Sequence, residues 1–168
     1  ENIELNPAIK PEKTTALEME YGAQLPGGIY VSFNVFDISI KEPIVYKYVV
    51  DGVEPGVDLE TYANYPKTGS RGVEADIQMR GEWGFLHGSF SYSQANDNQV
   101  PDYAVAGRDK YTLGLPSSKF TLLASIKLGN GLSLNPSVIF AGARYGYAFE
   151  DESPRKFDAD TLVNLFLD

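Results

Sequence analysis

The sequence has 168 residues and a formal net charge of −9 at pH 7. This acidic surplus argues against a nucleic-acid partner, because phosphates attract basic protein surfaces. The absence of cysteine excludes disulfide bonds and thiolate metal sites. The sequence contains no run of about 18 apolar residues, so no transmembrane helix is predicted. The 11 tyrosines, 9 phenylalanines and 16 glycines favour a β-rich fold, since aromatic residues favour strands and glycine favours turns.

A regular alternation of apolar and polar residues runs from 16 to 25, after a polar lead-in segment over 1–13. In a β-strand this alternation places the apolar side chains on one face and the polar side chains on the other. Glu18 and Glu20 fall on the polar face, and burying such carboxylates without partners in a soluble domain would cost several kcal/mol. We therefore expect the polar face to meet water and the apolar face to meet lipid, as in a transmembrane β-barrel.

The same pattern recurs and predicts three hairpins followed by the start of a seventh strand. The expected strands cover 16–25, 29–40, 73–80, 86–93, 124–128, 132–140 and 161–168. Short turns are expected at 26–28, 81–84 and 129–131. A β-bulge is expected at Val35–Phe36, where the alternation changes parity. Another is expected at Pro136, which has no N–H to donate to a neighbouring strand.

Three long loops separate these hairpins, over about 42–68, 96–118 and 142–160. All short connections then lie at one end of the strands and all long ones at the other, which is typical of outer-membrane barrels. Tyr30 and Trp83 lie near short turns, where an interfacial aromatic girdle is expected. Because a last strand ending at Asp168 leaves an unpaired edge in lipid, we expect the chain to be a segment of a longer barrel.

Residues 6–14 read Asn-Pro-Ala-Ile-Lys-Pro-Glu-Lys-Thr and lead into a strand that contains Glu20-Tyr21-Gly22. This segment resembles the Asn-Pro-x-Leu-Lys-Pro-Glu-x-Thr motif of TonB-dependent outer-membrane receptors, with Ile9 in place of leucine. Further matches follow in family order at Leu25–Gly28, Asn34–Phe36, Ile44–Tyr46, Ser70–Glu74, Leu115–Leu122 and Gly131–Pro136. The resemblance covers nearly the whole chain.

The resemblance implies an all-β, antiparallel, up-and-down transmembrane barrel, of which residues 1–168 form about seven of about 22 strands. It further implies a receptor in the outer membrane of a Gram-negative bacterium that imports a scarce solute, with a ferric siderophore as the first expectation. The implied partners are outer-membrane lipid, the plug and remaining strands of the same protein, and TonB. No cofactor and no nucleic acid are expected.

Candidate substrate contacts follow from position in or beside the long loops. Exposed aromatic side chains there could stack on a chelated ligand, and basic side chains, Lys110, Arg155 and Lys156 among them, could attract an anionic ferric chelate. The same residues could instead pack the loops together or contact lipid head groups. The predicted set is Tyr46, Tyr48, Tyr62, Tyr65, Tyr103, Arg108, Tyr111, Arg144, Tyr145 and Tyr147.

A second set of charged residues has the parity of the polar, lumen-facing side. It consists of Glu18, Glu20, Glu74, Asp76, Arg80 and His87. These side chains could form ion pairs with a plug, or pair with one another along a solvated barrel wall. His87 is the single histidine, and a metal site needs several converging ligands, so no metal site is predicted.

No catalytic motif is found, neither a nucleophile elbow nor a phosphate-binding loop nor a zinc-binding His-Glu-x-x-His. We therefore expect no enzymatic activity. Two other interpretations remain open beside the receptor. One is a complete outer-membrane barrel of about eight strands with a structural or adhesive role. The other is a soluble β-sandwich that acts as a binding module.

Overall fold

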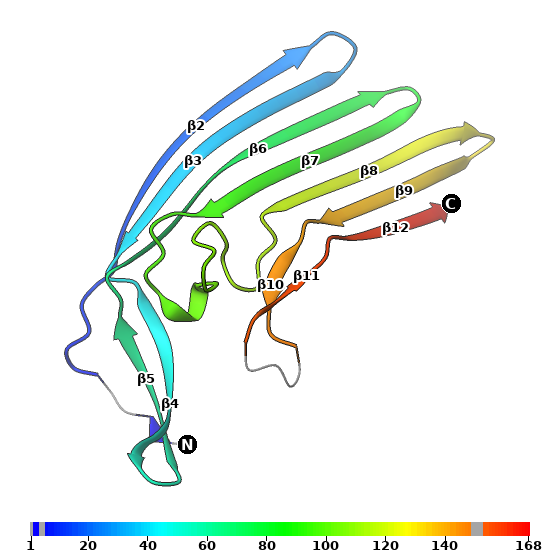
Figure 1. The fold of residues 1–168 in the computed structure, drawn as a ribbon. Coiled ribbons are helices and arrows are strands. Elements are labelled where there is room, and N and C mark those ends of the chain that lie inside the picture. The colour runs from blue at the N-terminus through cyan, green and yellow to red at the C-terminus, as the bar shows by residue number, and fades with distance from the viewer. Residues whose placement is uncertain (1, 4–5, 149–152) are drawn as a thin grey trace.

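The computed structural model describes residues 2–3, 6–148 and 153–168, and its main unit is one curved antiparallel sheet (Figure 1). Its strands are β2 Lys13–Leu25, β3 Ile29–Lys41, β6 Lys67–Gly81, β7 Gly84–Ala95, β8 Ser118–Gly129, β9 Leu132–Ala141 and β12 Asp160–Leu167. They follow the order β12-β9-β8-β7-β6-β3-β2, each antiparallel to its neighbours. The expected all-β, up-and-down architecture of a partial barrel is confirmed.

Cross-strand register sorts the side chains of this sheet onto two chemically different faces. One row, on the polar face, runs from β2 to β8 through Glu20, Asn34, Glu74, Ser91 and Lys119. The adjacent row, on the opposite face, consists of Met19, Val35, Val73 and Tyr92. Met19 is 74% exposed and Tyr92 is 42% exposed. An exposed apolar face of this kind is the one that lipid covers in a membrane barrel.

The main sheet has no second layer packed against it in the described part of the chain. The buried hydrophobic residues there are Val45, Ala95, Val100, Val105, Ala124 and Tyr145. A β-sandwich would bury one whole apolar face against a second sheet, so the structure contradicts the soluble sandwich. β2 and β12 end the strand order without pairing to each other, so the sheet is open and the complete small barrel is contradicted as well.

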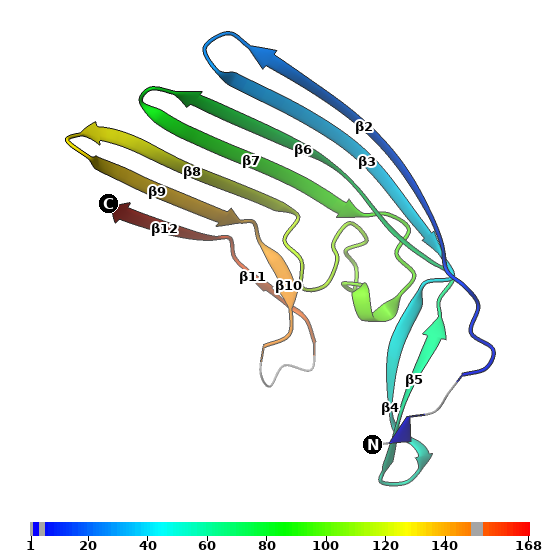
Figure 2. The ribbon, with the colours of Figure 1, turned by 180° about the vertical axis from the view of Figure 1, so that it is seen from behind.

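The connections differ in length between the two ends of the sheet, as expected. Short turns follow β2, β6 and β8 at one end, and the three long connections follow β3, β7 and β9 at the other (Figures 1 and 2). The turn after β2 requires glycine at position 28, where φ is +73°. Arg80 N–H donates to Gly28 O at 2.9 Å, and a Cβ at position 28 would collide with the carbonyl oxygen of Arg80.

The first long connection contradicts the expectation of a loop without regular structure. It contains a hairpin of β4 Ile44–Glu54 and β5 Val57–Asn64, and β1 Asn2–Ile3 pairs parallel with β5. Both hairpin strands are rich in β-branched and aromatic residues, which favour extended backbone. The expectation failed because the prolines of this segment lie at the tip and the base of the hairpin, where they interrupt neither strand.

The base of this hairpin is closed by backbone hydrogen bonds. Tyr65 N–H donates to Pro43 O at 3.0 Å, and Glu42 N–H donates to Pro66 O at 3.3 Å. The main sheet resumes directly after this clamp, because β6 begins at Lys67 and so before the end of the loop expected over about 42–68. The hairpin is therefore an excursion from the main sheet that returns to its starting point.

The other two long connections also contain short ordered elements. Residues 96–117 include the 3₁₀ turn η1 Pro101–Tyr103 and a bridge between Ala104 and Thr112. The third connection contains β10 Arg144–Gly146 paired with β11 Arg155–Phe157, and its residues 149–152 lie outside the described residues. No helix in the described part of the chain is long and apolar enough to cross a membrane.

The two bulges predicted from the sequence are wrong. β3 keeps one continuous register with both neighbours through Val35–Phe36. Phe36 instead turns onto the polar face opposite Gly72, where a Cβ on the glycine would lie 2.7 Å from the ring, so an aromatic side chain fills the space that the glycine leaves. β9 keeps its register with β12 through Pro136, and the register shift between β8 and β9 lies beside their turn, at Lys127–Gly129.

Substitution of the turn glycines tests the β2–β3 hairpin. Gly27→Ala is expected to cost about 1 kcal/mol, because φ is +81° and nothing lies near the new Cβ. Gly28→Ala is expected to cost roughly 1 to 3 kcal/mol more, because its Cβ meets the Arg80 carbonyl. Urea unfolding of the intact protein in detergent measures both. Equal losses of stability would contradict the close approach of Arg80 to this turn.

Candidate functional site

The second and third long connections contact each other at the loop end of the sheet. Leu113 N–H donates to Tyr103 O at 3.0 Å, which closes the second connection on itself. Gly114 N–H donates to Tyr145 O at 2.7 Å. Because Tyr145 belongs to β10, this last hydrogen bond joins the two connections. The structure therefore brings together residues that are far apart in the sequence.

Tyr145 is the centre of this contact and is only 8% exposed. The ring of Tyr111 packs edge-on against it, with ring centroids 5.0 Å apart. The guanidinium carbon of Arg108 lies 5.0 Å from the Tyr145 ring centroid. Aromatic pairs and cation–π contacts each contribute about 0.5 to 1.5 kcal/mol. Tyr145 therefore holds the two connections together, and its covered ring leaves little surface for a ligand.

A second basic and aromatic group lies on the β10–β11 hairpin. The guanidinium carbons of Arg144 and Arg155 lie 5.6 and 5.1 Å from the ring centroid of Phe157. A groove of about 510 Å³ opens beside this group, and we call it the loop groove; it is lined by Leu113, Gly114, Arg144, Tyr145, Gly146, Tyr147 and Phe157. Tyr147 is 57% exposed there. Sequence reasoning missed Phe157, although its position after Arg155-Lys156 was a usable signal.

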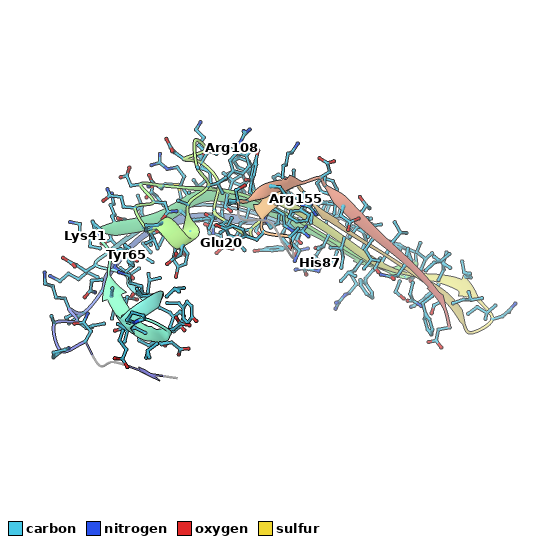
Figure 3. The ribbon with its side chains drawn as sticks, turned by 60° about the horizontal axis from the view of Figure 1, so that its bottom comes forward. Glu20, Lys41, Tyr65, His87, Arg108 and Arg155 are labelled. Carbon is cyan, nitrogen blue, oxygen red and sulfur yellow. The ribbon has the colours of Figure 1, made fainter. Side chains whose placement is uncertain are left out.

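Four predicted tyrosines, Tyr46, Tyr48, Tyr62 and Tyr65, lie on the β4–β5 hairpin or at its base, which Figure 1 shows apart from β10 and β11. Tyr103 lies in η1 of the second connection. The rings of Tyr46 and Tyr62 make an edge-on contact with centroids 5.8 Å apart. Tyr48 donates its hydroxyl to the Asp58 carboxylate, and this hydrogen bond raises the pKa of Tyr48 above its usual value. Tyr65 lies at the hairpin base (Figure 3). The predicted substrate residues thus form two groups, one on this hairpin and one in the second and third long connections, of which Arg144, Tyr145 and Tyr147 line the loop groove.

The residues predicted to line the lumen share one face of the main sheet, and Figure 3 shows Glu20 and His87 on the same side. Their assignment to a lumen stays a prediction. His87 Nε2 lies 2.6 Å from the Asp76 carboxylate. Of the other predicted residues, Glu18 lies opposite Phe36 and Arg80 opposite Phe85. Among the described residues, no group of three or more histidine and acidic side chains could hold a metal ion.

Acceptor atoms dominate the middle of this polar face. Glu20 and Glu74 flank Asn34 in one cross-strand row, beside a hollow of about 420 Å³. Asn34 Nδ2 donates to Glu74 at 3.3 Å, whereas Asn34 Oδ1 is buried and has no hydrogen-bond partner among the described residues. We call these three residues the acceptor row. The two exposed carboxylates of this row favour a donor-rich, positively charged partner.

Comparison with known proteins identifies relatives for the whole chain. A family model described as "TonB dependent receptor-like, beta-barrel" matches residues 2–168. The chain is similar to the siderophore receptor PirA from Acinetobacter baumannii, with 13% identity, a TM-score of 0.70, and coverage of 97% of this chain and 26% of PirA. A search of curated proteins finds no match.

Two other solved structures show the same fold. The ferric-catecholate import receptor Fiu from E. coli K12 has 17% identity and a TM-score of 0.72, over 96% of this chain and 22% of Fiu. A variant of the ferric enterobactin receptor PfeA from Pseudomonas aeruginosa has 14% identity and a TM-score of 0.69, over 96% of this chain and 24% of PfeA. The chain therefore spans about a quarter of the length of the structures that it matches.

Replacement of Tyr145 tests its role as the link between the two connections. Tyr145→Ala is expected to raise the hydrogen-exchange rate of the Gly114 amide about tenfold, because the ring contacts with Tyr111 and Arg108 are lost. Tyr145→Phe keeps the ring and is expected to behave like the unmodified protein. Equal exchange in both variants would show that the backbone bond does not depend on the ring contacts.

Proposed function

The chain belongs to the TonB-dependent receptor β-barrel family, and we propose that it is part of the barrel wall of an outer-membrane importer for a ferric siderophore. In this proposal residues 1–168 belong to one barrel domain, whose remaining strands pair with the open edges of β2 and β12. The plug of the same protein fills the lumen, and TonB supplies the energy for import. The location is the outer membrane of a Gram-negative bacterium.

The observation that carries the proposal is the loop groove, where arginines and aromatic rings are combined in an acidic protein. Arg144 and Phe157 line this groove. Arg155 lies against the same Phe157 ring, and Arg108 lies against Tyr145. A local positive field attracts an anionic ligand, and aromatic faces can stack on its rings. A ferric catecholate combines both properties. The name of Fiu, a ferric-catecholate import receptor, supports this ligand class. The names of PirA, a siderophore receptor, and of PfeA, a ferric enterobactin receptor, support a ferric siderophore more broadly.

The proposal assigns transport to the chain and no catalytic activity. The relatives are receptors and importers, and among the described residues that line the loop groove no nucleophile is paired with a general base. The hairpin tyrosines Tyr46, Tyr48 and Tyr62, which are 45%, 53% and 52% exposed, provide a second surface that the ligand can contact on its way to the groove.

Binding of ferric enterobactin to the intact receptor tests the role of the groove. Arg144→Gln combined with Arg155→Gln is expected to weaken binding about tenfold, since two charge-assisted contacts of the groove are removed. Quenching of intrinsic protein fluorescence reports the affinity. Arg80→Gln combined with Lys127→Gln removes the same charge near the short turns at the other end of the sheet and is expected to change the affinity less than about twofold. If both double variants bind equally, the groove is not the binding site.

The acceptor row leads to a proposal for the plug. We propose that basic side chains of the plug dock on Glu20 and Glu74, which lie on either side of Asn34 in one cross-strand row. Both carboxylates are exposed and open to a partner, and a charge-assisted hydrogen bond to a carboxylate is stronger than one between neutral groups. The wall of the barrel would then hold the plug through few but strong contacts.

Calorimetry of the intact receptor tests this docking, because plug and barrel can unfold in separate transitions. Glu20→Gln combined with Glu74→Gln is expected to lower the plug transition by a few degrees and to leave the barrel transition unchanged. Glu54→Gln combined with Glu82→Gln has the same change of charge outside the acceptor row and serves as the control. A lower barrel transition with an unchanged plug transition would mean that these acids stabilise the wall alone.

A further inference from the structure

A row of lysines crosses the main sheet at its loop end. Lys13 of β2 lies opposite Lys41 of β3, and Lys41 lies opposite Lys67 of β6. All three have the parity of the apolar face, and Lys13 lies about 13 Å along the strand from the exposed Leu17. Like charges directly opposite each other in a sheet destabilise it. We call these three residues the lysine row, and it indicates a place where an anion is held.

The acids beside the lysine row are already engaged by other groups. Three ion pairs lie around it, namely Lys67–Asp97 at 2.6 Å, Arg71–Asp37 at 3.6 Å and Lys10–Glu42 at 3.7 Å. Lys67 also holds the pKa of Asp97 below its usual value, so that carboxylate stays charged and paired. Glu12, next to Lys13, accepts from the Ile44 N–H at 3.3 Å.

Lys13 and Lys41 themselves are exposed and have no ion-pair partner in the ranges that the structure describes. Figure 3 shows Lys41 at the margin of the sheet, close to Tyr65 at the base of the hairpin. Two neighbouring ammonium groups that form no ion pair with a carboxylate among the described residues can offer up to six N–H donors to one ligand. Such a site fits a phosphate group, which carries negative charge and several acceptor oxygens.

An apolar groove lies on the same face of the sheet, further along the strands from the lysine row. Its volume is about 520 Å³, and the paired Asp37 and Arg71 belong to its lining. Its large apolar lining residues are Leu17, Met19, Val35, Phe36, Val73 and Tyr92. Leu17 and Met19 are 73% and 74% exposed. A ligand that combines phosphate with hydrocarbon chains would match both parts at once, whereas inorganic phosphate would leave the groove empty. The combination therefore favours a phosphorylated lipid over a free anion.

We propose that Lys13 and Lys41 bind a phosphate of lipopolysaccharide in the outer leaflet, with an acyl chain of the same molecule along the apolar groove. The proposal rests on the proposed outer-membrane location, because the long connections then lie on the outer side and place the lysine row at head-group height. The lipid would neutralise the repulsion between the two lysines. It would also fix the height and the tilt of the barrel wall in the membrane.

The test is a titration of the purified intact receptor with diphosphoryl lipid A, followed by native mass spectrometry. Lys13→Gln combined with Lys41→Gln is expected to weaken binding about 10- to 30-fold, since each lysine near an anionic membrane surface contributes roughly fivefold. The single variant Lys41→Gln is expected to bind lipid A about fivefold more weakly. It keeps the test decisive if the double variant does not fold. Lys47→Gln combined with Lys127→Gln is the control and is expected to bind lipid A like the unmodified protein.

Two results would overturn the proposal. Unchanged affinity for lipid A in the double variant would show that the lysine row does not hold the lipid. Displacement of lipid A by millimolar inorganic phosphate would show a site for the free anion instead of the lipid. Ferric enterobactin binding by the double variant is expected to stay unchanged, so a receptor that binds lipid A but no ferric chelate would disprove the proposed import and leave this inference standing.

Discussion

The pairing of backbone N–H and C=O groups within one sheet is the constraint on which the rest of this structure depends. Hydrocarbon offers no hydrogen bonds, so a membrane-spanning strand must find both neighbours in protein. In this chain every strand of the main sheet between β3 and β9 does so. Because the sheet is a single layer, neither face has to pack against a second sheet. The two faces can therefore differ in chemistry, with acceptor side chains on one and exposed apolar side chains on the other.

Period-two alternation made the main sheet predictable, because lipid on one face and water on the other impose the strictest pattern that a strand can carry. The β4–β5 hairpin was not predicted, since it lies outside the sheet and its prolines resemble those of a loop. The parity change at Val35–Phe36 was read as a bulge, but Phe36 compensates for Gly72 on a neighbouring strand. Such a partner is visible only once the register is known.

The candidate site was predictable in composition and not in arrangement. Position beside the long connections singled out Arg108, Tyr111, Arg144 and Tyr145. The sequence did not indicate that Tyr145 would be covered by the other connection, because contacts between two long loops depend on a sheet that brings their ends together. The sequence also did not distinguish rings that can face a ligand from rings that pack against other side chains. The burial of Tyr145 assigns its ring to the second kind.

The clamp at the base of the β4–β5 hairpin has a consequence for the order of folding. β3 and β6 are adjacent in the sheet although a long excursion separates them in the chain. The hydrogen bonds between Glu42 and Pro66 and between Tyr65 and Pro43 bring the two ends of that excursion together. Once the hairpin has formed, β6 meets β3 at an entropic cost close to that of a tight turn. The main sheet can then grow one neighbouring strand at a time along the whole segment.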